Sequence, residues 1–164
     1  MAHTTDKIVN DVMRREDRTG TGIVTVDTGG RTQYGISERA NPEAWADEKV
    51  TEEEARTIYE RKYVRAPKFH LIPDEALRAH LVDFGVNSGP MIAIMKLQAV
   101  VGADVDGILG PDTLGRLATQ DPARVRLGLI AERIRLIGRV VTKDPKNQLK
   151  HLNGWLNRVL EFLL

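Results

Sequence analysis

The chain has 164 residues, of which 41% are hydrophobic and 29% are charged, and its formal net charge is +1. This composition excludes an intrinsically disordered chain, and the length suits one domain better than two independent ones. No cysteine is present, which excludes disulfides and thiolate chemistry.

The first predicted element is an amphipathic helix that ends near residue 16. Thr5 or Asp6 can cap its start. Its apolar residues fall on one face: Ile8, Val9, Val12 and Met13. The same pattern brings Glu16 onto this face. We therefore expect a carboxyl group at the end of a buried stripe, where partial desolvation would raise its pKa. The alternative is a solvated Glu in a fraying last turn.

A small β-hairpin is predicted next. Residues 23–26 and 31–34 have the composition of short strands, and Asp27-Thr28-Gly29-Gly30 between them can adopt the positive φ angles of a tight turn. A second acid, Asp27, therefore stands on a hairpin that we expect to face Glu16 across a loop.

The rest of the chain is predicted to be helical. Asn41-Pro42 starts a short helix that carries Trp45, and a capping box at residues 51–54 opens a helix with Tyr59 and Tyr63 directed inward. These tyrosines can line a sugar cleft or belong to the core. Further helices are expected over about 74–85, 90–101 and 111–117, from Asp121 through at least Ile137, and from about residue 147. The predicted fold class is mainly α with a small β-hairpin near the N-terminus.

No metal or cofactor site is predicted. The four histidines are scattered, and His80 on an apolar helix face suits a hydrogen-bonded core position. Asp104 and Asp106 suggest a calcium loop, but the position that should supply its bidentate Glu is Gly115. We read this stretch as a turn.

The two acids suit hydrolysis of a glycosidic bond. That reaction needs one protonated carboxyl group to donate to the leaving oxygen and one carboxylate to act as nucleophile or to activate water. Glu16 suits the first role and Asp27 the second. The hydroxyl of Thr32 could hold the attacking water beside Asp27.

Several motifs, taken in order, resemble one enzyme family. Glu16 followed by D-x-G-G-x-T-x-x-G-I at residues 27–36 is similar to glycoside hydrolase family 108, the N-acetylmuramidases of phages and bacteria. The likeness continues over 51–63 and 83–90. Residues 105–114 resemble the D-G-x-x-G-x-x-T signature of predicted peptidoglycan-binding domains, and residues 154–159 resemble the tail that accompanies them.

The resemblance implies a lysozyme-like fold and a role for each matching residue. Glu16 would be the general acid, with Asp27 and Thr32 around the hydrolytic water. The expected substrate-binding residues are Gly29, Gly30, Tyr34, Tyr63 and Asn87. Residues 1–90 would form the catalytic region and 91–164 a peptidoglycan-binding-like region that shares its core. The reaction would cleave the β-1,4 bond between N-acetylmuramic acid and N-acetylglucosamine, without a cofactor, in a monomer.

One departure from the family concerns the loop after Glu16. The family usually continues with Gly-Gly, whereas this chain has Asp17-Arg18 and a loop about two residues longer. Arg18 could pair with Glu16 and lower its pKa, neutralise Asp27 or bind substrate. Asp17 is a rival for the second carboxylate.

Two other functions remain open: a lytic transglycosylase, and a non-catalytic wall-binding or secretion-associated protein. A nucleic-acid-binding role is not expected, because no recognition motif accompanies the arginines. Residues 121–158 carry nine Lys or Arg against three acids, which suits an anionic wall or a membrane surface.

The expected biological role is that of a phage endolysin. The N-terminus lacks a signal-peptide pattern, and no segment approaches the roughly 20 apolar residues of a membrane span. We expect the protein to accumulate in the host cytoplasm until another protein releases it to the wall or periplasm.

Overall fold

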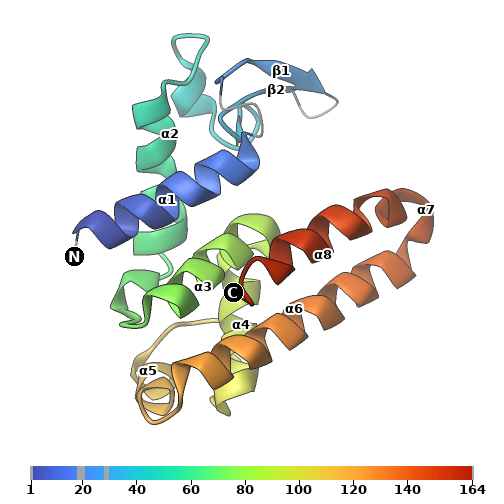
Figure 1. The fold of residues 1–164 in the computed structure, drawn as a ribbon. Helices are drawn as coiled ribbons and strands as arrows, with labels where there is room; N and C mark the ends of the chain where they lie inside the picture. The colour runs from blue at the N-terminus through green and yellow to red at the C-terminus, as the bar shows by residue number, and fades with distance from the viewer. Residues whose placement is uncertain (1, 18–20, 28–29, 164) are drawn as a thin grey trace. The chain divides into compact units, whose positions relative to one another are not determined.

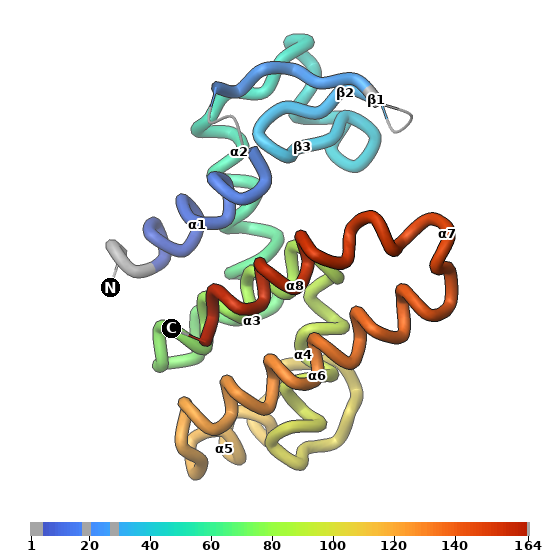
Figure 2. The backbone as a smooth tube through the Cα atoms, turned by 45° about the vertical axis from the view of Figure 1, so that its right-hand side comes forward, coloured from blue at the N-terminus to red at the C-terminus, as the bar shows by residue number. Residues whose placement is uncertain are grey.

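The computed structural model describes residues 2–17, 21–27 and 30–163, and the chain divides into two compact units, Met1–Ala66 and Pro67–Leu164. Figures 1 and 2 show the elements of each unit. The predicted regions 1–90 and 91–164 meet inside the second unit, one residue after the start of the helix Pro90–Val101.

The first unit combines helices with a three-stranded sheet. Its helical elements are α1 (Ala2–Glu16), η1 (Pro42–Trp45), α2 (Glu52–Tyr59) and η2 (Glu60–Arg65). The strands β1 (Thr25–Asp27), β2 (Gly30–Gln33) and β3 (Ile36–Ser37) form an antiparallel sheet in the order β1-β2-β3. The predicted hairpin is therefore present, and β3 extends it.

The core of the first unit follows from the helix pattern. All four apolar residues assigned to one face of α1 are buried, together with Trp45 and Tyr59. The Thr51 hydroxyl accepts a hydrogen bond from Glu54 N at 3.2 Å, and Glu54 Oε2 accepts one from Thr51 N at 2.8 Å. This reciprocal capping fixes where α2 begins. α2 passes directly into η2, a π-helical turn that the sequence pattern did not predict.

In the described residues of the second unit, every regular element is a helix. Its elements are η3 (Phe69–Leu71), α3 (Glu75–Ser88), α4 (Pro90–Val101), α5 (Pro111–Ala118), α6 (Pro122–Lys143), α7 (Pro145–Gln148), η4 (Leu149–His151) and α8 (Leu152–Leu160). Asp74 and Asp121 cap α3 and α6 with their side chains. In both views α6 and α8 run side by side (Figures 1 and 2), and Ile130, Ile137 and Val159 form a buried cluster between them.

A buried ion cluster ties α3 to α6 and α8. The Asp83 carboxylate is fully buried and lies 2.8 Å from Nη2 of Arg133, which is only 1% exposed. Arg158 on α8 reaches the same carboxylate at 2.9 Å. The two guanidinium groups lower the pKa of Asp83 against the opposing effect of burial.

The mainly α fold with a small β element near the N-terminus is confirmed. Among the described residues, no helix is both long and apolar enough to cross a membrane.

Candidate active site

Glu16 is the last residue of α1 and follows the buried apolar stripe. The residue is half-buried, and its Oε1 atom is shielded from solvent. The helix ends here with the bond from Asp17 N to Met13 O at 2.8 Å. Glu16 thus presents a carboxyl group at the edge of the core.

The turn between β2 and β3 packs against Glu16. Gly35 in this turn has a φ of +75°, and a β-carbon added to it would lie 2.6 Å from the Cβ of Glu16 and 2.3 Å from the Tyr59 hydroxyl. That hydroxyl donates a hydrogen bond to Tyr34 O at 3.1 Å. Only glycine fits both the backbone angle and the space.

Tyr63 lies in η2, the π-helical turn that follows α2. Its ring centroid is 5.8 Å from that of Tyr59. Burial raises the pKa of Tyr63, and the negative charge of Glu16 raises it further. The phenol is therefore within electrostatic reach of the Glu16 carboxylate.

The loop between α1 and the sheet is held by side chains. Asp17 accepts a hydrogen bond from Gly22 N at 2.9 Å. Gln33 donates to Gly22 O at 2.7 Å and accepts from Val50 N at 2.7 Å. Asp17, the rival for the second carboxylate, therefore has a structural partner. Arg18 lies outside the described residues.

The second predicted acid stands at the end of β1. The register pairs Asp27 with Gly30 and Thr25 with Thr32. Gly30 has a φ of +101° with open space around it, and Thr32 is half-buried in the middle of the sheet. Only the backbone of Asp27 is described, and Gly29 lies outside the described residues.

A groove of about 410 Å³ runs beside the C-terminal half of α1 in the first unit. Tyr34 lines it together with Met13, Asp17 and Arg56. One predicted substrate-binding residue thus faces an open cavity next to the end of α1.

Asn87 belongs to the second unit. It lies near the end of α3 and lines a mainly apolar pocket of about 240 Å³ with Ile92, Ile137 and Trp155. The structure therefore brings together Glu16, Tyr34 and Tyr63 within one unit, while Asn87 is part of the other.

The sequence pattern gave Gly35 no role of its own, and it left Tyr59 either in a sugar cleft or in the core. The signal was available for Gly35, because it is the glycine of the T-x-x-G-I portion of the motif. Tyr59 was expected to point inward, and it does so with 3% exposure.

The D-G-x-x-G-x-x-T motif fixes the loop between α4 and α5. The buried Gln98 donates to Asp106 Oδ1 at 2.7 Å and to the Thr113 hydroxyl at 3.2 Å, and it accepts from Gly107 N at 2.9 Å. The hydrogen bonds from Ile108 N and Gln98 lower the pKa of Asp106. The stretch is a turn, as expected.

Across the described ranges, no group of three or more His, Asp or Glu side chains is placed to hold a metal ion. His80 is fully buried, and burial together with the nearby Arg133 lowers its pKa to about 3. A neutral imidazole in this setting belongs to the core. However, neither of its ring nitrogens has a hydrogen-bond partner within the described chain, which differs from the hydrogen-bonded state expected from the sequence.

Comparison with known proteins separates the chain into two family regions. Residues 9–89 match the family described as Glycosyl hydrolase 108, and residues 92–160 match the family described as Predicted Peptidoglycan domain. The solved structure of Brucella abortus SagA is similar over 99% of this chain and 97% of that one, with 26% identity and a TM-score of 0.71. No curated protein matches the chain.

Proposed function

Residues 9–89 belong to the glycosyl hydrolase 108 family and the protein is a glycoside hydrolase, and we propose that it is a muramidase that cleaves the β-1,4 bond between N-acetylmuramic acid and N-acetylglucosamine. Residues 92–160 belong to a predicted peptidoglycan domain, which makes peptidoglycan its partner.

The arrangement of Glu16 carries this proposal. A general acid must be placed where it can reach the leaving oxygen, and the half-buried Glu16 stands at the end of α1 beside the turn at Gly35. The turn at Gly35 packs against the side chain of Glu16, and the phenol of Tyr63 lies within electrostatic reach of its carboxyl group. A fixed acid is better placed for proton transfer than a mobile one.

In this proposal, Asp27 and Thr32 hold the attacking water. The pairing of Thr25 with Thr32 and of Asp27 with Gly30 assigns positions 27 and 32 to the same face of the hairpin, because residues of a strand alternate between faces. For an inverting reaction, the Glu16 and Asp27 carboxyl groups should stand roughly 6.5–9.5 Å apart.

The proposed substrate-binding residues are Gly29, Gly30, Tyr34, Tyr63 and Asn87. The groove at Tyr34 and the half-buried phenol of Tyr63 support this assignment for the first unit. Aromatic side chains that offer an apolar face and one hydroxyl suit sugar rings.

We further propose that the protein acts as a phage endolysin, as a monomer that reaches the wall from the host cytoplasm.

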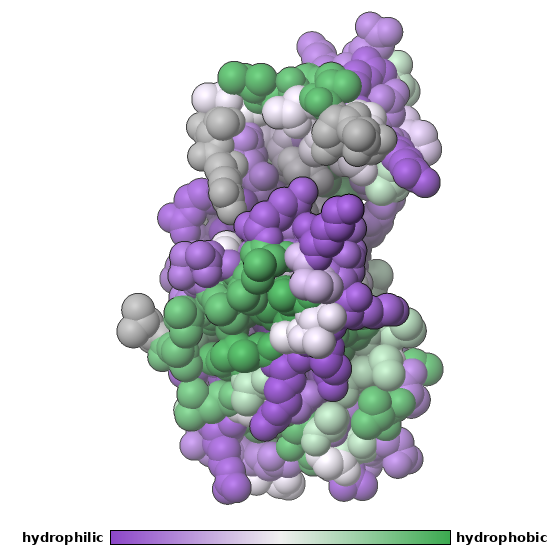
Figure 3. All heavy atoms as spheres, turned by 90° about the vertical axis from the view of Figure 1, so that its right-hand side faces the viewer, coloured by the Kyte–Doolittle hydropathy of each residue, from purple (hydrophilic) through white to green (hydrophobic). Residues whose placement is uncertain are grey.

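An anionic membrane surface is a second proposed partner. Figure 3 shows apolar side chains gathered over the second unit and bordered by hydrophilic ones. Val140, Leu149 and Leu160 on its last helices are 38%, 59% and 46% exposed, which supports contact with an apolar surface.

The test is mass spectrometry of the fragments released from purified sacculi. Fragments with reducing N-acetylmuramic acid ends, lost in Glu16→Gln, are the expected result. Glu53→Gln is the matched control, because Glu53 is exposed on α2 and does not line the groove at Tyr34. Anhydro ends would identify a lytic transglycosylase instead. Sacculus binding without released fragments would indicate a non-catalytic wall-binding protein.

A further inference from the structure

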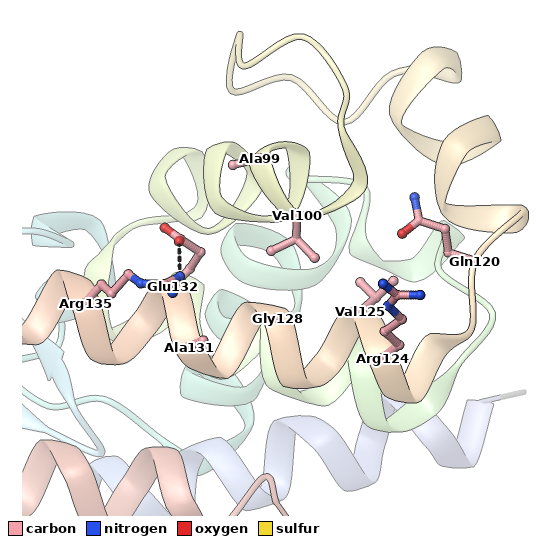
Figure 4. A pocket seen from close by; sticks show the side chains of 9 residues that line it. All are labelled: Ala99, Val100, Gln120, Arg124, Val125, Gly128, Ala131, Glu132 and Arg135. Atoms are coloured by element: carbon pink, nitrogen blue, oxygen red, sulfur yellow. Dashed lines mark hydrogen bonds and ion pairs between the residues drawn. The ribbon is translucent and has the colours of Figure 1, made fainter.

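A groove in the second unit is lined by residues to which the family match gives no role. It lies between α4 and α6 and has a volume of about 690 Å³. Figure 4 shows Gln120 and Arg124 at one end, Glu132 and Arg135 at the other, and Val100 of α4 directed toward Gly128 of α6 between them.

The floor of the groove is made by small residues. Gly128 and Ala131 of α6 lie opposite Ala99 and Val100 of α4. A β-carbon on Gly128 would lie 2.8 Å from Val100 Cγ1, so the glycine lets the two helices approach closely. Val100 fills the space over Gly128, and the rest of the middle of the groove is lined by Ala99 and Ala131, which suits a narrow chain with short side chains.

The two arginines stand on one face of α6. The series Arg124, Gly128, Ala131 and Arg135 has the spacing of a single helix face. Eleven residues at about 1.5 Å each separate the two arginines by roughly 16 Å along the helix. An extended peptide of about five residues covers the same length.

The two arginines differ from each other in what they contact. Glu132 is neutralised by Lys96 at 3.0 Å and by Arg135 at 2.7 Å. Arg124 is exposed and makes no hydrogen bond or ion pair within the described part of the chain. Arg135 is 66% exposed and keeps further N–H groups open to solvent. Both guanidinium groups can therefore donate hydrogen bonds to a carboxylate of a ligand.

Gln120 adds a polar group of fixed orientation. Its side-chain nitrogen donates to Val101 O at 3.0 Å, at the end of α4. This bond leaves the amide oxygen of Gln120 beside Arg124 as an acceptor for a peptide N–H or an ammonium group.

We propose that this groove binds the peptide stem of peptidoglycan, a short acidic peptide that contains alanine, with one carboxylate at Arg124 and another at Arg135. The small floor accepts methyl side chains, and the spacing of the arginines matches the length of a stem. This inference rests on the proposed function, because it takes peptidoglycan as the substrate. It assigns recognition of the peptide to the second unit and of the glycan to the first.

The experiment is a calorimetric and NMR titration of the full chain carrying Glu16→Gln, which keeps the sugar intact. The probes are a synthetic stem tetrapeptide, the same peptide with its carboxyl groups amidated, and a peptide-free oligosaccharide of N-acetylglucosamine. We expect the acidic tetrapeptide to shift the amide signals of Gly128 and Ala131. Arg124→Gln and Arg135→Gln should each weaken it at least about tenfold, since each removes a charge-assisted contact.

Lys146→Gln is the matched control. Lys146 is exposed on α7, outside the groove, and its loss changes the net charge equally. The inference is wrong if the tetrapeptide fails to bind, if the amidated peptide binds as well as the acidic one, or if Lys146→Gln weakens binding as much as Arg124→Gln. It is also wrong if the oligosaccharide shifts the groove signals. Sacculus hydrolysis by the unmodified chain, measured separately, tests the proposed function independently of this titration.

Discussion

The Cα of Gly35 packs directly against the side chain of Glu16, since a β-carbon at residue 35 would lie 2.6 Å from the Cβ of Glu16. The sheet and the first helix of the unit therefore meet at the proposed general acid. Gly35→Ala should displace Glu16 and lower the rate of sacculus hydrolysis by at least about tenfold, because small shifts of a catalytic group reduce rates strongly.

Gly102→Ala separates this effect from backbone strain. Gly102 has a φ of +74°, almost equal to the +75° of Gly35, but has open space around it. Gly102→Ala should lose roughly 1–2 kcal/mol of stability in thermal unfolding through backbone strain, and Gly35→Ala should lose at least as much, because its steric clash adds to the same strain. Only Gly35→Ala should lose activity; equal activity in the two variants would contradict the positioning role of Gly35.

Tyr63 provides a spectroscopic test of its distance from Glu16. The Glu16 charge contributes to the raised pKa of Tyr63, so Glu16→Gln should lower that pKa. It should stay above its ordinary value, because burial is the larger cause. Ultraviolet titration of tyrosinate measures the change, and Tyr63→Phe assigns it. An unchanged titration in Glu16→Gln would place the two groups too far apart to interact.

Local signals predicted most of the secondary structure. The capping box at Thr51, the side-chain caps at Asp74 and Asp121, and the prolines in the first turns fix helix starts through contacts within three residues. The apolar period of α1 correctly placed Val9 and Val12 in the core. These features depend on neighbours in sequence, which explains why one sequence suffices to predict them.

The site depends on contacts that a sequence pattern does not contain. Gly35 meets Glu16 and Tyr59 only after the strands turn back onto the helices. Asp17, which was considered as a second acid, bonds to Gly22 across the loop. His80 was assigned correctly to the core, but the stacking of Phe162 on its ring comes from the distant C-terminal segment, and neither ring nitrogen has a hydrogen-bond partner in the described chain.

The buried pair of Asp83 and Arg133 joins the two family regions, because the acid lies in residues 9–89 and the arginine in residues 92–160. Asp83→Asn should destabilise the protein by roughly 3–5 kcal/mol, since it leaves a buried guanidinium without its counter-charge. The double variant Asp83→Leu with Arg133→Met should recover part of this loss. Urea unfolding measures both, and a single variant with wild-type stability would contradict a structural role for the pair.

Acid should destabilise the second unit through His80. Its pKa is about 3 in the folded state, against an ordinary value near 6.5 in the unfolded chain. Below pH 6.5 the unfolded chain takes up a proton that the folded state excludes. Stability should therefore be complete above this pH and should fall toward pH 3 by at most about 1.4 kcal/mol per pH unit.

The groups that face His80 act in opposite directions. Arg133 and Arg126 keep the folded-state pKa of His80 low, while Asp83 opposes them. The lowered pKa values of Asp83, Glu38, Glu54 and Glu132 add their own loss of stability only near and below the ordinary values of 3.8 and 4.5, so the range from pH 6.5 to about 5 separates His80 from these carboxylates. His80→Phe keeps an aromatic ring against Phe162 and removes the titrating group. Urea unfolding across this range should show a flatter pH dependence in His80→Phe, and an identical slope in both proteins would rule out His80 as the cause.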